Sequence, residues 1–339
     1  DSRYSCCTGL QHDICRNLHS FKPIGRHRLH MYQPQAFTSQ MNQEQALDPG
    51  SESSIPPARR SKTQNLRREL WKAPITAKFG ILVVFVYGFV ALFAPFLTPY
   101  GEAEIVGPEF ALWGEPFILG TDGLGRDMLT RLLFGARNTV GIAFITTCLA
   151  FLIGGLTGLF AAIYGRLFDQ VASRIVDVLM AIPQLIFALM LLTIFGTSIP
   201  TLIIVIAVLD ATRIFRVCRA VSLNVVVLDY FEAARLRGEG IFWLCIREIL
   251  PNIAAPLLAE FGLRFCFVFL MIAALSFLGL GIQPPTADWG SMVRENSVLI
   301  TYGDITPILP AIAIAILTLG VNFLVDWFLH KSSGLKEGH

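Results

Sequence analysis

Long apolar runs that hold no charged residue constrain this chain more than any other feature of its sequence. Residues 79–97 read FGILVVFVYGFVALFAPFL, and residues 139–164 read TVGIAFITTCLAFLIGGLTGLFAAIY. A helix needs about 20 apolar residues to cross a bilayer. Backbone amides in hydrocarbon must bond within their own segment, which favours helices over open strands. Both runs therefore predict helices that span a membrane.

The same criterion selects six segments of the chain. They cover residues 79–97, 139–164, about 177–195, about 199–216, about 257–281 and 305–329. The composition agrees with a membrane protein, since 15% of the residues are charged, whereas soluble domains carry about 25%. We therefore predict an all-α polytopic membrane protein with six transmembrane helices.

The placement of Lys and Arg predicts the orientation of these helices, because the basic side of a membrane protein faces the cytoplasm. Seventeen Lys and Arg residues lie just before the first span, in the second-to-third and fourth-to-fifth connections, or near the end of the chain. The other two loops, residues 98–138 and 282–304, hold four. We expect both termini in the cytoplasm and these two loops outside.

The first 78 residues are polar and basic, and they lack the apolar stretch of about 7–15 residues that a signal peptide needs. We expect residues 1–40 to be an upstream extension foreign to the natural chain, with Met41 as its start and Met31 as the alternative. The predicted parts are a disordered cytoplasmic tail over 1–78, a transmembrane domain over 79–331 and a short cytoplasmic tail over 332–339.

Cysteine and histidine spacing predicts no metal site. Cys6, Cys7 and Cys15 lie near His12 and His19, but they do not form the two closely spaced ligand pairs of a zinc knuckle. We expect the remaining cysteines to be small buried apolar residues. These are Cys148, Cys218, Cys245 and Cys266.

A charged segment interrupts the apolar pattern between the fourth and fifth spans. Residues 231–252 read FEAARLRGEGIFWLCIREILPN and carry six charged side chains. The composition of residues 224–237 favours a helix that places Val227, Phe231 and Ala234 on one face. This segment lies within the predicted cytoplasmic loop.

Glycines and prolines divide the rest of this loop. Gly238 and Gly240 allow a turn into a second helical stretch, and Pro251 and Pro256 frame the entry to the fifth span. The apolar side of the second stretch is formed by Ile241, Leu244 and Cys245. The loop, residues 217–256, is predicted to be a helix–turn–helix under the membrane. By composition it is either an amphipathic connector on lipid headgroups or a docking surface.

The motif in this loop resembles the EAA loop of ABC importer permeases. The resemblance rests on Glu232-Ala233-Ala234, on Gly238 after three further residues, and on a later Leu-Pro pair. In that family the loop inserts into a groove of a cytoplasmic ATPase subunit and transmits its closure to the spans. One departure is Glu248, where peptide-type permeases usually carry His. The resemblance implies ATPase coupling by Glu232, Ala233, Ala234, Gly238, Leu250 and Pro251, with Glu232 as the partner of a basic group.

Two outward segments support the same family. Residues 119–137 read LGTDGLGRDMLTRLLFGAR, and residues 276–292 read SFLGLGIQPPTADWGSM. Both are similar to signatures of the second, C-type permease subunit of binding-protein-dependent dipeptide and oligopeptide (peptide/nickel/opine) importers, although Ala287 replaces a common Pro. The resemblance covers residues 70–331 and implies the type I ABC importer permease fold in a bacterial inner membrane.

The second of these segments predicts a loop at the outer mouth. The prolines are expected to stop the fifth helix, and Trp289 is expected to anchor the loop at the membrane interface. The alternative is that Trp289 is an ordinary interfacial aromatic. The loop residues that we single out are Gln283, Pro284, Pro285, Trp289 and Gly290.

Charges within the predicted spans need a reason, because each costs at least about 2.5–3.5 kcal/mol at a helix centre. Glu260 and Arg264 are one turn apart in the first two turns of the predicted fifth span, which favours a structural ion pair near the cytoplasmic boundary over a substrate site. Asp210 and Arg213 end the fourth span and Asp326 ends the sixth. We expect a structural or gating role for them.

Small residues and prolines within the spans predict how the helices pack. Gly154, Gly158 and Ala162 form a stripe on the second span that predicts close helix packing. Pro183 and Pro310 are expected to kink their helices.

The resemblance implies a non-catalytic permease subunit. No G-x-x-x-x-G-K-[ST] phosphate loop occurs in the sequence, so a partner must hydrolyse ATP with Mg²⁺, and this chain is expected to bind no cofactor, metal or nucleic acid. The implied partners are a sister permease that forms a heterodimer with it, two ABC ATPase subunits and an extracytoplasmic substrate-binding protein. The cargo stays open among dipeptides, oligopeptides, glutathione, nickel chelates, opines and sugars.

Two other classes of function were weighed. An intramembrane enzyme is disfavoured, because neither H-E-x-x-H nor G-x-S-x-G occurs and all six His residues lie outside the predicted spans. An ion-coupled secondary transporter or channel would place ionisable groups near the midplane and often shows inverted repeats. The most central stretches of the predicted spans are uncharged and no internal repeat is evident, so this class is the alternative.

Overall fold

The computed structural model describes residues 73–332 apart from residue 115. The chain divides into two units, Asp1–Ser61 and Lys62–His339, and the described residues belong to the second unit. The predictions for residues 1–72, including the extension, and for residues 333–339 lie outside the described residues. The predicted disordered tail reaches residue 78, but residues 75–78 are already helical.

Helices form all the regular elements of the described part of the chain. They are α4 (Ile75–Leu97), α5 (Met128–Gly135), η1 (Ala136–Val140), α6 (Gly141–Tyr164), α7 (Arg166–Ala181), α8 (Gln184–Phe195), α9 (Ile199–Val226), α10 (Asp229–Leu236), α11 (Ile241–Trp243), η2 (Leu244–Ile249), α12 (Leu250–Phe277), α13 (Trp289–Asn296), η3 (Ser297–Tyr302) and α14 (Ile308–Ser332). The predicted all-α class is confirmed for these residues.

Four helical runs are long and apolar enough to cross a membrane, or five if a bent pair is one span. The four are Ile75–Leu97, Met128–Tyr164, Ile241–Phe277 and Ile308–Lys331. The helix α9 is long, but its middle turns carry Asp210, Arg213 and Arg216, which lower its apolar character. The six-span count is therefore not confirmed by length and composition.

The third predicted span is not one helix. The chain breaks between α7 and α8, whose axes differ in direction by 90°. Ile182 is extended, with φ −90° and ψ 131°, as expected for a residue whose helical conformation clashes with the following proline ring. Pro183 thus ends α7 and starts α8, a stronger effect than the predicted kink. Pro310, by contrast, lies in the first turn of α14, where the missing N–H needs no partner.

The fifth helix begins earlier and ends earlier than predicted. It starts at Ile241 and runs through the π-helical η2 into α12, so that Pro251 lies in the first turn of α12 and Pro256 inside it. It ends at Phe277 because Gly279 adopts a φ of +89°. The N–H of Leu280 then donates to the carbonyl of Leu275 at 2.9 Å, which is a Schellman cap. The expectation that the prolines stop this helix is wrong.

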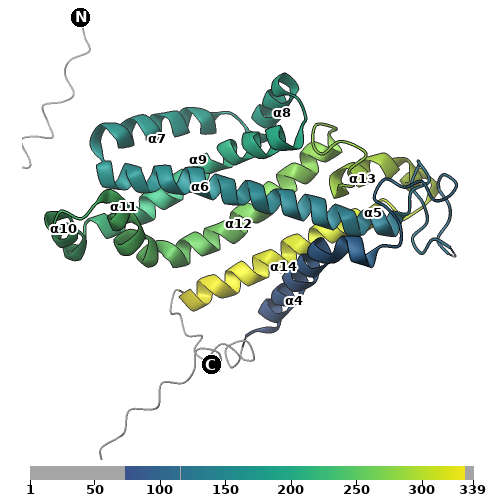
Figure 1. Ribbon diagram of the computed structural model, residues 1–339, viewed down its shortest axis with the longest axis horizontal. Helices are drawn as coiled ribbons and strands as arrows, with labels where there is room; N and C mark the ends of the chain where they lie inside the picture. Colours follow the sequence, from purple (N-terminus) through teal and green to yellow (C-terminus); the bar gives the residue numbers. More distant parts are fainter. Residues whose placement is uncertain (1–72, 115, 333–339) are drawn as a thin grey trace, which may run out of the picture. The chain divides into compact units, whose positions relative to one another are not determined.

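Glycines bring the helices into two groups, and both are visible in Figure 1. In the first group α6 lies on α9, since a Cβ added to Gly154 would be 2.4 Å from the carbonyl oxygen of Ala211. In the second group α4 and α12 lie on α14, since a Cβ on Gly80 or on Gly262 would overlap α14. The predicted packing role of Gly154 and Gly158 is confirmed.

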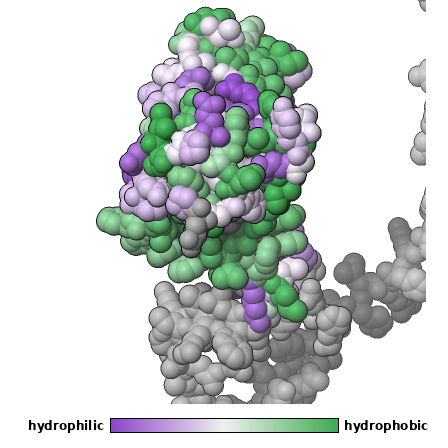
Figure 2. All heavy atoms as spheres, turned by 90° about the vertical axis from the view of Figure 1, so that its right-hand side faces the viewer, coloured by the Kyte–Doolittle hydropathy of each residue, from purple (hydrophilic) through white to green (hydrophobic). Residues whose placement is uncertain are grey.

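The loops gather at the two ends of these helices. The segment 98–127, α5 and α13 lie at one end of α6 and α12, whereas α10 and α11 lie at the other (Figure 1). The face at the first end carries hydrophilic side chains near its middle and hydrophobic ones around them (Figure 2). The two sets of predicted site residues are therefore far apart on the same scaffold.

Candidate functional site

The charged loop forms an elbow, which we define as residues 229–249 (α10, α11 and η2). The first helix ends at Leu236, and Gly238 turns the chain with a φ of +83°. The N–H of Gly238 donates to the carbonyl of Arg235 at 3.0 Å and that of Glu239 to Ala234 at 3.4 Å. The predicted helix–turn–helix is present, and the turn depends on a conformation that favours glycine.

One side of the elbow is packed into the protein. Phe231 and Ala234 are buried, as predicted, and they join a cluster with Leu159 of α6 and Cys218 of α9. The prediction for Val227 is wrong, because α9 ends at Val226 and a turn separates it from α10, which leaves Val227 77% exposed. A buried apolar side on two long helices makes the elbow a fixed part of the fold.

The opposite side of the elbow mixes charged and apolar groups. Glu232 and Ala233 are exposed, next to arginines at 235 and 237. Leu236 is 82% exposed and Phe242 71% exposed. Large exposed apolar side chains among charged ones are more typical of an interaction surface than of a solvated loop.

The two ends of the EAA-like motif lie next to each other. Leu250 and Pro251 are exposed at the start of α12. The side-chain amide of Asn252 donates to the hydroxyl of Tyr230 at 3.0 Å and to the carbonyl of Glu248 at 2.6 Å. Sequence reasoning did not identify Tyr230 or Asn252 as contributors, because only the fold brings α10 and α12 together.

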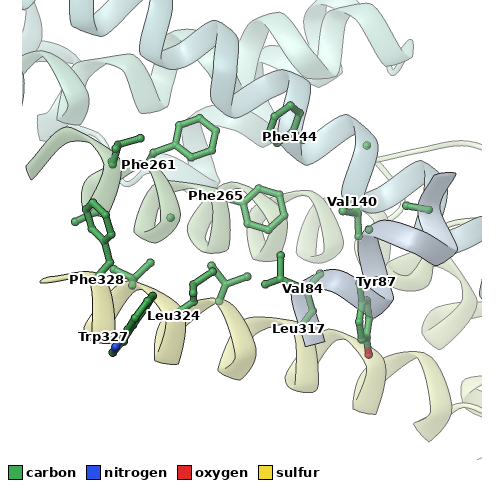
Figure 3. A pocket seen from close by; sticks show the side chains of 18 residues that line it. Val84, Tyr87, Val140, Phe144, Phe261, Phe265, Leu317, Leu324, Trp327 and Phe328 are labelled. Atoms are coloured by element: carbon green, nitrogen blue, oxygen red, sulfur yellow. The ribbon is translucent and has the colours of Figure 1, made fainter. Parts of the chain in front are cut away.

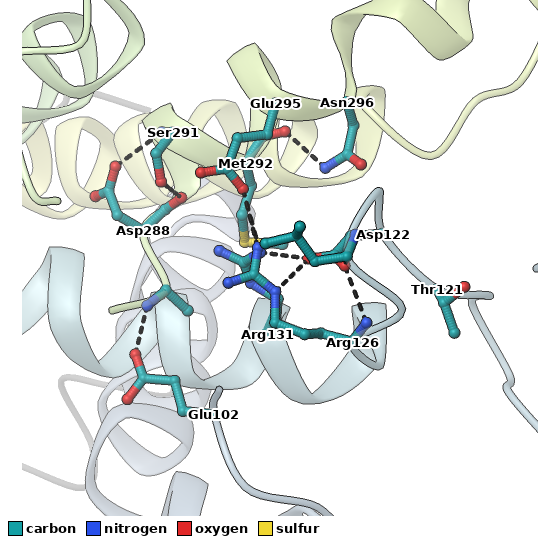
Figure 4. Close-up of polar contacts among 12 residues, drawn as sticks. Glu102, Thr121, Asp122, Arg126, Arg131, Asp288, Ser291, Met292, Glu295 and Asn296 are labelled. Carbon is teal, nitrogen blue, oxygen red and sulfur yellow. Dashed lines mark hydrogen bonds and ion pairs between the residues drawn. The ribbon is translucent and has the colours of Figure 1, made fainter. Parts of the chain in front are cut away.

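A buried cluster of charges lies at the other end of the protein (Figure 4). We call Asp122, Arg126, Arg131 and Glu295 the outer clamp. Arg126 Nε lies 2.7 Å from Asp122 Oδ2, and Arg131 also contacts this carboxylate. Both guanidinium groups reach Glu295 Oε2, at 3.3 and 3.2 Å. The clamp joins the segment before α5 to α13.

The clamp was missed as a site, although the sequence carries a signal for it. Three charged residues follow one another closely in the 119–137 motif, but their partner Glu295 comes from the 282–304 loop. Burial alone raises the pKa of Asp122, but hydrogen bonds from the Arg126 backbone and the Arg131 side chain outweigh it and leave the pKa below its ordinary value. Asp122 is therefore held as a carboxylate.

Part of the predicted outer-mouth loop lies in the core, whereas Pro284 and Pro285 are exposed. Trp289 is 1% exposed and meets the rings of Tyr87 and Phe269 edge to face. Its Nε1 donates to the carbonyl of Leu132 at 2.9 Å. The prediction that Trp289 anchors the loop at the membrane interface is wrong, because this indole is packed among protein side chains.

The neighbours of Trp289 explain how α13 is held. Asp288 caps α13, accepting from Ser291 N at 2.9 Å and from Thr139 Oγ1 at 2.8 Å. Burial raises its pKa above the ordinary value, and these hydrogen bonds oppose that rise. A Cβ on Gly290 would be 2.2 Å from the carbonyl oxygen of Ala273 in α12. Gln283 donates to the carbonyl of Gly279 at 3.1 Å, and the bond between Pro284 and Pro285 is cis.

A third set of charges lies between the helices. Arg264 Nε is 2.8 Å from Glu260 Oε1, so the two residues expected to pair do so. Arg264 Nη1 also lies 3.6 Å from Asp210 Oδ1 of α9. The helical run that carries them starts at Ile241, about five turns before Glu260.

The other candidate residues show no clustering. The described residues contain no group of three or more His, Cys, Asp or Glu placed to hold a metal ion, and Cys6, Cys7 and Cys15 lie outside them. Cys218, Cys245 and Cys266 are buried, but Cys148 of α6 is exposed, contrary to the expectation.

Comparisons with known proteins agree with this picture. Residues 154–332, more than half of the chain, match the family model "Binding-protein-dependent transport system inner membrane component". The chain is 34% identical to the di/tripeptide transport system permease protein DppC of Pseudomonas aeruginosa over 73% of this chain and 84% of that protein. It is 32% identical to the dipeptide permease DppC of Alkalihalophilus pseudofirmus over 73% and 82%. It is 29% identical to the glutathione permease GsiD of Pectobacterium atrosepticum over 81% and 93%.

Proposed function

The chain belongs to the family of binding-protein-dependent transport system inner membrane components, and on that premise we propose that it is the C-type permease subunit of an ATP-driven importer of short peptides. Together with a sister permease it forms the path for a solute that a binding protein delivers. The names of the relatives support a di- or tripeptide or glutathione as the cargo. Two ATPase subunits supply ATP hydrolysis with Mg²⁺.

The elbow is the observation that carries this proposal. Its buried side is fixed to α6 and α9, and its exposed side offers Glu232 beside the apolar Leu236. A soluble partner that grips the exposed side would move the helices beneath it. The ATPase-coupling residues are Glu232, Ala233, Ala234, Gly238, Leu250 and Pro251.

We count both α9 and the bent pair α7–α8 as spans in this proposal, which gives six spans with both termini in the cytoplasm. It has 28 residues, or about 42 Å of helix, which exceeds the roughly 30 Å of a hydrocarbon core. Its charges also have partners: Arg216 Nη2 lies 2.5 Å from Asp177, and Arg219 pairs with Asp169. Paired charges are far less costly in a membrane than single ones.

The elbow and the outer clamp would then lie on opposite sides of the membrane. The proposed parts are the cytoplasmic elbow loop over 217–256, an outer loop over 98–138 and a second outer loop over 282–304. The outer loops, with Gln283, Pro284, Pro285, Trp289 and Gly290, form the end that faces the binding protein.

Ion-coupled secondary transport is the alternative, and one observation favours it. Asp210, Glu260 and Arg264 form a charged set within the predicted spans, and ion-coupled transporters use ionisable groups inside their spans. Family membership argues for ATP as the energy source. Peptide uptake by membrane vesicles distinguishes the two mechanisms. An importer of this family still takes up peptide when ATP is supplied and ionophores have removed the ion gradients.

Substitutions in the elbow test the proposal. The chain is produced with its neighbouring subunits, purified in mild detergent and examined for a bound ATPase. We expect Glu232→Ala to weaken ATPase binding and Gly238→Pro to abolish uptake, because proline cannot adopt a φ of +83°. Membrane insertion should be normal in both. Full uptake by the Gly238→Pro protein, or purification of the native chain without any ATPase, would overturn the proposal.

A further inference from the structure

We propose that Asp210 and Arg264 form an ionic lock between the two helix groups, and that this lock passes movement of the elbow from α9 to α12. The inference rests on the proposed function and deepens it. Asp210 is a positioning residue in this scheme, since it acts through Arg264 and does not touch the solute.

The first step is that close backbone contact holds the helices together within each group, whereas side chains of one shared core join α6 and α9 to α12. Within the first group, a Cβ on Gly158 would be 2.9 Å from the carbonyl oxygen of Phe215, so the backbones of α6 and α9 are in close contact. Within the second, a Cβ on Gly320 would be 2.6 Å from Val83. Close backbone contact of this kind makes each group a unit.

The second step is that close packing between the start of α6 and the second group is interrupted on one side. An apolar cavity of about 590 Å³ lies between α6 on one side and α4, α12 and α14 on the other (Figure 3). Phe144 of α6 faces Phe261 and Phe265 of α12 there, with Leu324 of α14 further away. Helices that border such a cavity can move relative to one another at smaller cost than helices in a close-packed core.

The third step is that a charge pair crosses between the groups. Asp210 of α9 is fully buried, and Arg264 of α12 lies 3.6 Å from it. Arg264 is held on its own helix by Glu260 at 2.8 Å and by the ring of Phe267, whose centroid is 4.6 Å from the guanidinium carbon. Arg213 lies one turn further along α9 and adds a second positive charge near Asp210.

The fourth step is that the lock is incomplete in this conformation. Both carboxylate oxygens of Asp210 are buried and lack a hydrogen-bond partner. A distance of 3.6 Å is an ion pair but exceeds a hydrogen bond. A small movement of α12 toward α9 would bring Arg264 within hydrogen-bond distance of Asp210. The arrangement with the two helices closer together would then be lower in free energy than the present one.

The fifth step connects the lock to the elbow. The elbow continues from the end of α9 and leads into α12, so it joins the two helices that carry Asp210 and Arg264. Its apolar side packs on the first group through Leu159 and Cys218 and on the start of α12 through Ile253. Movement of the elbow therefore changes the position of α12 relative to α9. The Asp210–Arg264 pair stabilises the position in which the two helices are closer together.

The test uses the complete complex with the sister permease, the ATPase subunits and the binding protein in liposomes. The cargo is whichever of dialanine, trialanine and glutathione the wild-type complex transports. We measure solute transported per ATP hydrolysed for wild type and Asp210→Asn. Allosteric coupling is typically worth about 5–150-fold, so we expect the ratio to fall roughly tenfold while ATP hydrolysis stays within about twofold. Loss of structure alone would lower both rates together.

Two further variants sharpen the test. In an Arg264→Gln background, Asp210→Asn should have little additional effect, because residues that act as a pair are not additive. Asp177→Asn is the matched control, since it removes an exposed Asp–Arg pair to α9, and it should keep the wild-type ratio. An unchanged ratio in Asp210→Asn, or an equal fall in Asp177→Asn, would overturn the lock.

Other outcomes are also decisive. If Asp210→Asn does not assemble, Asp210→Glu and Arg264→Lys keep the charges and change the geometry; a lowered ratio supports the lock and a wild-type ratio in both overturns it. If the wild-type complex transports none of the three solutes with ATP, the proposed function fails and the lock fails with it. If the wild-type complex is active and Asp210→Asn keeps the wild-type ratio of solute transported to ATP hydrolysed, the lock is overturned and the proposed function stands.

Discussion

Gly238 shows how one residue sets the shape of the elbow. Its φ of +83° is readily adopted by glycine, and no atom would lie within 4 Å of an added Cβ. Gly240, two residues later, has a φ of −69° and is equally uncrowded. The difference between them is therefore backbone conformation alone.

This pair makes a matched prediction. Gly238→Ala should destabilise the turn by about 1–2 kcal/mol, the usual cost of a left-handed conformation for a residue with a Cβ. Gly240→Ala should be neutral or slightly stabilising, because it restricts the unfolded chain. Hydrogen exchange in α10 measures the effect, and equal exchange in both variants would contradict it.

The contribution of the outer clamp to stability is expected to depend on pH. The pKa of Asp122 lies below its ordinary value of 3.8 in the folded protein. The unfolded chain therefore binds this proton more tightly than the folded one, so the clamp stabilises fully above the ordinary value and loses its contribution as the pH falls through the folded-state pKa. Pepsin cleavage of residues 98–127, measured relative to cleavage of an unfolded substrate at the same pH, should rise only in that acid range.

Removal of one partner should shift this acid transition. Arg131→Met takes away a donor and a positive charge from buried Asp122, so the pKa of Asp122 rises and the segment opens at a higher pH. The cost at neutral pH should be about 1–3 kcal/mol for a buried group left short of a hydrogen bond. Arg137→Met is the control, since Arg137 is exposed. The same acid transition in both variants would rule out the clamp.

Residue identities alone could indicate these sites only in part. The Gly238 turn follows from local conformation, so the sequence predicted it. The outer clamp and the burial of Trp289 depend on neighbours distant in the chain, such as Glu295 and Leu132, and a motif within one segment does not name them.

At the scale of elements, the contact between α6 and α9 is set by glycine. Gly154 and Gly155 are neighbours, but an added Cβ would overlap α9 only at Gly154 and would meet nothing within 4 Å at Gly155. We expect Gly154→Ala to separate the helices and cost about 1–3 kcal/mol, as overpacking does. Gly155→Ala should leave the thermal unfolding temperature in detergent unchanged. A similar loss in both would show that the contact is not the cause.

The ends of the elements were predicted less well than their existence. Pro183 was expected to kink one span and instead separates α7 from α8. The fifth helix was expected to start near its prolines, but Pro251 and Pro256 lie within a continuous run that includes a π-helical turn. Proline is tolerated in a first turn or where neighbouring helices satisfy the freed backbone groups, and apolar patterning does not reveal where this occurs.

At the scale of the whole described unit, the long helices connect the two proposed functional ends. The elbow and the outer clamp are separated by the length of the helices (Figure 1), and the mid-helix charges lie between them. A partner at the elbow can influence the outer end only through movement of the helix groups. The cavity between the groups leaves room for that movement.

Local patterns in the sequence determined that this is a helical membrane protein and that a charged helix–turn–helix interrupts its spans, because apolar run length and glycine turns act over neighbouring residues. The tertiary structure alone decided which charges meet, that Trp289 is a core residue, and that Asp210 faces Arg264 in mid-helix. Those contacts join distant segments, and only the packing of the helices brings them within reach of one another.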